Sequence, residues 1–119
     1  MKVEVDSPTE VSKDFLDFVQ FVSDGEKLHD WELIIWSLKG EAECITDMRL
    51  LYIPFVDDIE KMEVWFLHEV AHATFEIGGG SRDDSIWHRE LWKVEFDRLL
   101  GSYMPNINQK TILWLRKLE

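Results

Sequence analysis

The chain has 119 residues, of which 45% are hydrophobic, and carries one cysteine and a formal net charge of −11. This length fits a single domain over residues 1–119, and the apolar content predicts a packed core rather than a disordered chain. One cysteine excludes a disulfide framework, and the negative charge disfavours a nucleic-acid partner because it repels phosphate.

The N-terminal half predicts one helix and several strands. Residues 1–5 alternate apolar and polar, as a short strand does. Ser7 and Glu10 form a capping-box pattern that predicts a helix over 8–24, ended by Asp24 and Gly25. Aromatic and β-branched residues then predict strands over 31–38, 41–46 and 49–53, the last closed by Pro54. Because the connections are short, we expect these three strands to be antiparallel neighbours.

The C-terminal half predicts helices. Asp57 and Glu60 repeat the capping pattern and open a helix to about Ile77 that is apolar nearly all round, which is typical of a buried helix. Gly78-Gly79-Gly80 ends it, and further helices are expected over 86–103 and 108–118. The fold class is therefore α+β: an N-terminal helix, a small antiparallel three-stranded sheet, a buried helix, a second long helix and a short C-terminal one.

A metal-binding pattern lies in the buried helix as His68-Glu69-Val70-Ala71-His72. Two histidines four residues apart project from one helix face, at a spacing that suits one tetrahedral zinc. Glu69 lies beside the first ligand, where it can act as general base toward a zinc-bound water. Such polar residues are costly inside an apolar helix unless they have a partner, so we predict one zinc ion per chain.

A catalytic zinc needs a third protein ligand while one position stays open to water. His88 follows His72 by sixteen residues, on the next predicted helix, and is the preferred ligand. Glu90 is the alternative, with Glu95 also available if the ligand is a carboxylate. Trp92 lies one turn after His88 on the same helix face, where its ring would form a wall of the site.

These residues resemble those of a known family. His68-Glu69-Val70-Ala71-His72 followed by His88-Arg89-Glu90-Leu91-Trp92 is similar to the pattern of SprT-like zinc peptidases. The resemblance covers about residues 8–103. It implies a minimal zincin domain in which His68, His72 and His88 bind zinc and Glu69 is the general base. It also implies a peptide or protein substrate, held by analogy along a strand at the edge of the sheet. A second resemblance, to minimal gluzincins, implies Glu90 as the third ligand.

Three functions remain open at this stage. The leading one is a zinc-dependent metallopeptidase, and the alternatives are a non-catalytic, zinc-stabilised binding protein and an acidic interaction or inhibitor protein with an incidental HExxH. Several further residues have a possible place at the site. Four could donate to an oxyanion, namely Tyr52, Arg82, Arg89 and Tyr103, whereas Cys44 is expected in the core and His29 at the surface.

The two ends of the chain carry further expectations. The N-terminus lacks the basic flank and apolar run of a signal peptide, and no apolar stretch is long enough to span a bilayer. The sequence therefore predicts a cytoplasmic protein without a membrane partner. The amphipathic segment 105–119 either packs on the core or covers the site.

Overall fold

The order of elements is that of an α+β fold. The computed structural model describes residues 1–6, 10–36, 42–77 and 86–118, without the side chains at 77, 86–89 and 118. The elements are β1 (Lys2–Asp6), α1 (Lys13–Glu26), β2 (Glu32–Trp36), β3 (Glu43–Ile45), the 3-10 helix η1 (Thr46–Met48), β4 (Leu50–Pro54), α2 (Ile59–Ile77), α3 (Ile86–Tyr103) and α4 (Gln109–Leu118). The predicted α+β class is confirmed, and the strand expected over residues 1–5 is present as Lys2–Asp6.

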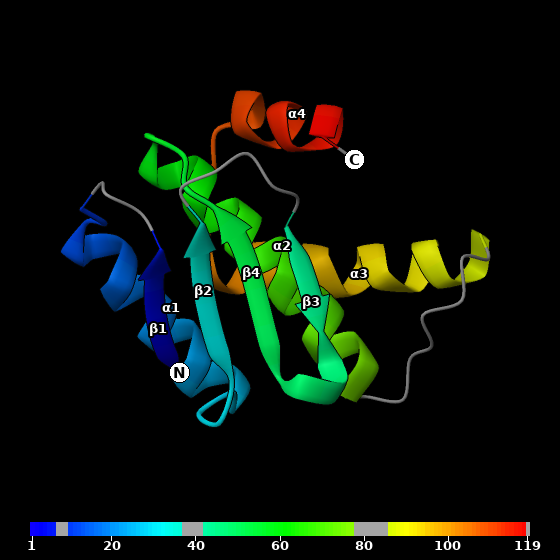
Figure 1. The fold of residues 1–119 in the computed structure, drawn as a ribbon. Helices are drawn as coiled ribbons and strands as arrows, with labels where there is room; N and C mark the ends of the chain where they lie inside the picture. The colour runs from blue at the N-terminus through cyan, green and yellow to red at the C-terminus, as the bar shows by residue number, and fades with distance from the viewer. Residues whose placement is uncertain (7–9, 37–41, 78–85, 119) are drawn as a thin grey trace.

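The sheet is mixed, so the expected antiparallel three-stranded sheet is wrong. Its order is β1-β2-β4-β3, with β1 parallel to β2, β2 parallel to β4, and only β3 antiparallel to β4 (Figure 1). The chain passes from β2 to the edge strand β3 and then turns back. That turn is made by η1 and by Arg49, whose φ of 54° is left-handed. β4 therefore enters between β2 and β3, and sequence neighbours β2 and β3 do not pair.

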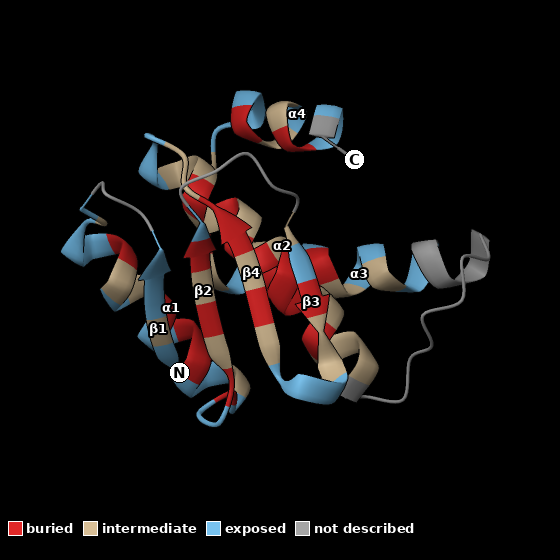
Figure 2. Ribbon diagram, viewed as in Figure 1, coloured by how far each residue is buried: buried red, intermediate tan, exposed pale blue. Residues whose placement is uncertain are grey.

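One face of the sheet is buried by helices. Side chains alternate along β2 and β4, so that Leu33 and Ile35 point to the same side as Leu51 and Ile53, and all four have 0% exposure. The helices α1, α2 and α3 lie on this side (Figures 1 and 2). Each fully buried aliphatic side chain contributes roughly 1.5–3 kcal/mol, so this layer of contacts is the main stabilising term of the sheet.

The start of α1 differs from the prediction. The helix begins at Lys13, where Ser12 is the N-cap and its Oγ accepts a hydrogen bond from the Phe15 N–H at 3.2 Å. Ser7, expected to be the cap, lies outside the described residues, and 10–12 are not helical. Ser12 caps the helix because its hydroxyl accepts a hydrogen bond from a first-turn N–H that otherwise has no partner.

The end of α1 is fixed by a close approach to α3. A Cβ at Gly25 would collide with the hydroxyl of Tyr103, so any larger residue there would have to displace the Tyr103 side chain. The helix continues to Glu26, two residues past the expected end. Lys27 then adopts the left-handed conformation, with φ of 60°, and its N–H donates to the Ser23 carbonyl.

α2 lies at the centre of the fold. Asp58 caps it through a 3.0 Å hydrogen bond from the Lys61 N–H, one residue after the expected cap. Several of its residues are completely buried: Val64, Phe66, Leu67, Val70, Ala71 and Ala73. The expected buried helix is thus confirmed.

α3 matches its predicted range, and α4 begins one residue late because Asn108 caps it. Gly78-Gly79-Gly80 lies outside the described residues. None of the helices that the structure describes is long and apolar enough to cross a membrane.

Candidate metal centre

His68, Glu69 and His72 converge on one side of α2. Each offers a ligand atom, and these atoms lie within 4.8 Å of one another. The two imidazole rings are 5.2 Å apart between centroids. This closeness follows from the helix, because residues four apart are separated by only about 40° around the axis and one turn along it. Two nitrogen donors and one carboxylate at this separation can hold a divalent transition metal.

The carboxylate of this group is buried and hydrogen-bonded. Glu69 has an exposure of only 3%, and its Oε1 lies 3.0 Å from Nδ1 of His68. A buried carboxylate costs several kcal/mol unless a donor or a cation compensates it. When Nδ1 of His68 donates to Glu69, the lone pair of the ring is on Nε2, which leaves that nitrogen to bind a metal.

Aromatic rings from α3 form the wall of this group. Trp92 stacks on His72 with centroids 4.9 Å apart and planes at 22°, and it meets the edge of His68 at 4.8 Å. Phe96 stacks behind Trp92 at 5.4 Å. Trp92 therefore lies against both histidines, as its helical spacing predicted. Within the described part of the chain, its Nε1 is buried without a hydrogen-bond partner, which is a polar group that a bound molecule would satisfy.

The phase of α3 decides which candidate third ligand faces the histidines of α2. His88 lies four residues before Trp92, so its backbone position is on the helix face that meets α2. Its side chain, like those of Arg89 and Arg82, lies outside the described residues. Glu90 is exposed and lies about 200° around the helix from Trp92. The helical phase therefore favours His88 over Glu90.

Glu95 is held by other partners. It accepts hydrogen bonds from Thr74 Oγ1 at 2.7 Å and from Arg98, and these bonds lower the pKa of its carboxyl, with Arg98 the larger cause. Arg98 also binds Glu26 of α1 at 2.5 Å. Tyr103 donates to Glu26 at 2.6 Å, and burial together with this bond raises the pKa of Tyr103 to about 12. The network joins α1, α2 and α3 and occupies both Glu95 and Tyr103.

The sheet edge reaches α2 through a residue that the sequence analysis missed. Glu76 follows His72 by one turn, and its carboxylate accepts a hydrogen bond from Thr46, the first residue of η1 directly after β3. The signal was the i, i+4, i+8 spacing of His68, His72 and Glu76. Cys44 is buried in β3, as expected for a core residue, and pairs with Thr46 at 3.8 Å. Neither Cys44 nor Glu76 belongs to the candidate metal cluster of His68, Glu69 and His72 among the described residues.

α4 packs against the N-terminal part of α2. Trp114 meets Trp65 edge to face at 5.4 Å, and Lys61 Nζ lies 5.2 Å from the Trp114 ring. Thr111 donates to Glu60, and the Asn108 N–H donates to it as well. The C-terminal helix is therefore docked on α2 between its first turn and Trp65, which precedes His68 by three residues.

The remaining candidates lie elsewhere. His29 is exposed and pairs with Asp24 at 3.4 Å, as expected for a surface residue. Tyr52 stacks on Trp36 at 5.0 Å, on the sheet face opposite the buried Leu51 and Ile53. Tyr52 is thus separated from the histidines by the sheet itself.

Comparison with protein-family models, with curated proteins and with solved structures finds no match for this chain. No family is assigned. The zincin interpretation therefore stands on the motif and on the arrangement of this chain's own residues.

Proposed function

We propose that this protein is a zinc-dependent metallopeptidase with a minimal zincin-like fold, similar to SprT-like domains. His68, His72 and His88 would bind one zinc ion, and Glu69 would be the general base. The observation that carries the proposal is the convergence of His68, Glu69 and His72 within 4.8 Å on a buried helix.

The donor set fits zinc. Two imidazoles and a third ligand from the next helix are the usual protein ligands of a catalytic zinc, and the hydrogen bond to Nδ1 of His68 is the usual outer partner. Zinc, when bound, would supply the positive charge that acidifies a water molecule and polarises a carbonyl group.

Two parts of the chain would handle the substrate. Glu69 would take a proton from the attacking water and return it to the leaving amine, and its burial strengthens such interactions by lowering the local dielectric. β3 is the antiparallel edge strand and lies beside α2. Its outer edge has no strand partner among the described residues, so an extended peptide can add there as a further strand.

The test combines zinc content with hydrolysis of an unfolded protein. Wild type is expected to hold about one zinc per chain and to cleave the substrate. Glu69→Gln is isosteric and should keep the zinc while losing about 10²–10⁴-fold in rate. His29→Ala, at an exposed histidine, is the control and should change neither. A wild type that binds no zinc, or a Glu69→Gln variant that loses it, would refute the assignment.

A second candidate is a non-catalytic, zinc-stabilised binding protein. It is favoured by the 3% exposure of Glu69 and by its bond to His68, which together suit a residue that orients a ligand rather than one that meets a substrate. In that case the zinc-loaded wild type would hydrolyse no peptide, and Glu69→Gln would weaken zinc binding. The third alternative, an acidic interaction protein, predicts no bound zinc at all.

A further inference from the structure

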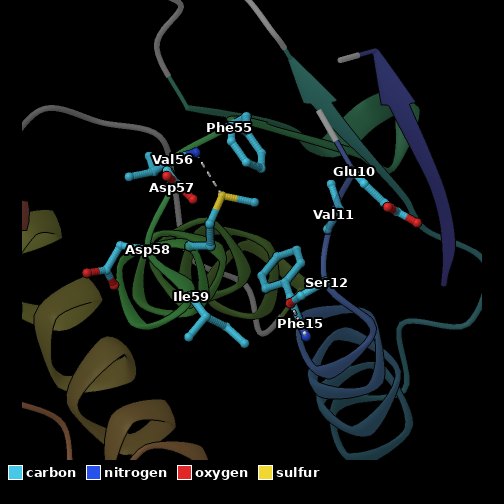
Figure 3. Close-up of a pocket in the computed structure, with 10 residues that line it drawn as sticks. Glu10, Val11, Ser12, Phe15, Phe55, Val56, Asp57, Asp58 and Ile59 are labelled. Carbon is cyan, nitrogen blue, oxygen red and sulfur yellow. Dashed lines mark hydrogen bonds between the residues drawn. The ribbon is translucent and has the colours of Figure 1, made fainter. Parts of the chain in front are cut away.

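A second site lies at the N-terminal end of α2, outside the carboxyl ends of the parallel strands. A cavity of about 260 Å³ opens between the N-terminal ends of α1 and α2 (Figure 3). In open α/β sheets, the carboxyl ends of parallel strands are where ligands usually bind. The cavity is distinct from the metal centre, because Met62 in its wall precedes His68 by six residues, about 9 Å along the helix.

The inner wall of the cavity is apolar. It is formed by Val11, Phe15, Phe55 and Met62, of which Phe15 is 1% and Met62 is 3% exposed. The Val56 N–H points into the same region, but it already donates to Sδ of Met62 at 3.2 Å, drawn as the dashed line in Figure 3. The wall therefore favours a hydrocarbon and offers no free backbone donor at this point.

The rim of the cavity is acidic. Glu10, Asp57 and Asp58 all line it and are exposed, and no basic side chain lines it among the described residues. Glu10 and Asp57 make no ion pair with the described residues, whereas Asp58 caps α2. The two helix N-termini contribute about +0.5 charge each. Three carboxylates outweigh them, so the mouth attracts a cation.

We propose that this cavity binds the side chain of a lysine or arginine from a protein partner. The aliphatic stem would lie against Phe15 and Met62, and the charged end would lie at the rim, attracted by the carboxylates of Glu10 and Asp57. The volume agrees with this occupant. Whole small-molecule ligands usually need about 300–1,000 Å³, whereas a cavity of about 260 Å³ fits one long side chain. Long basic side chains bury their stems while the charge stays at the water boundary.

The test follows the methyl group of Met62 by NMR, in full-length protein labelled at the methionine methyl carbons. N-acetyl-lysine N-methylamide and its arginine counterpart are titrated against N-acetyl-norleucine N-methylamide, which has an uncharged stem. Met48 is 65% exposed and Met104 is outside the cavity lining, so both are internal controls. We expect the basic probes to shift Met62 alone, and to bind more tightly than the norleucine probe.

A pair of variants isolates the charge. Glu10→Gln with Asp57→Asn removes two rim carboxylates and should weaken the basic probes by about two- to fivefold for each charge. Glu4→Gln with Asp97→Asn removes the same charge from exposed positions elsewhere and should have a smaller effect. The proposal is overturned if the basic probes leave Met62 unshifted, if norleucine binds equally well, or if the two double variants behave alike.

Discussion

Zinc should stabilise the fold by an amount that the size of the chain makes measurable. A ligand at one hundred times its dissociation constant stabilises the folded state by about 2.7 kcal/mol. For 119 residues, an unfolding entropy of about 2.1 cal/mol/K per residue gives roughly 250 cal/mol/K. Dividing the two predicts that Tm rises by roughly 11 °C when saturating zinc is added to metal-free protein.

The variant that tests this is His72→Ala. It removes one proposed ligand and also the ring that stacks on Trp92, so its metal-free Tm will fall for that second reason alone. The measurement is therefore the difference between Tm with and without zinc within each variant, by scanning calorimetry. We expect that difference to collapse in His72→Ala and to persist in His29→Ala, because His29 is outside the group. Equal zinc shifts in His72→Ala and wild type would show that the ion binds elsewhere.

Three more predictions follow from the helix α3 and its contacts. His88→Ala should lower zinc affinity by more than about 100-fold, which exceeds the effect of losing a hydrogen-bond partner of a ligand. Glu90→Ala should leave the affinity nearly unchanged. The reverse ranking in a competitive zinc titration would refute the choice of His88 as ligand. The raised pKa of Tyr103 means that its contribution to stability is complete below pH 10 and is lost as pH rises through about 12, so the urea midpoint should fall less over this range in Tyr103→Phe than in wild type. Arg98→Met should cost about 1–3 kcal/mol in urea unfolding, because Glu26, whose side chain is 10% exposed, loses its cationic partner; an unchanged midpoint would contradict that role.

The cluster of His68, Glu69 and His72 could be predicted from the sequence because it is local. His68 and His72 are brought together by one helix turn, and a buried helix is recognised by apolar residues on all sides. α3 was placed correctly for the same reason: a long periodic segment with clear ends. The position of Trp92 beside the histidines could be predicted because it lies one helical turn after His88 on the same helix face.

The lateral order of strands could not be read in this way. It depends on which strand occupies the centre of the sheet, and the short connections favoured a simple meander. In the structure, the left-handed turn at Arg49 brings β4 beside β2, and this conformation depends on contacts between distant segments. The start of α1 failed for a related reason, since Ser7 and Ser12 both have a capping side chain and the sequence does not rank them. Contacts between distant segments, such as Thr46 with Glu76, had no pairwise signal at all.

The two edges of the sheet have unlike consequences for self-association. β1 presents the charged residues Lys2, Glu4 and Asp6, all exposed, and such a strand resists pairing with a second molecule. β3 carries a single charged residue, the exposed Glu43, and is only three residues long. Each backbone hydrogen bond contributes roughly 0.5–1.5 kcal/mol, so an added strand at β3 is held weakly and released readily. The fold thus keeps one edge open to an extended chain without the aggregation hazard that a long bare edge would carry.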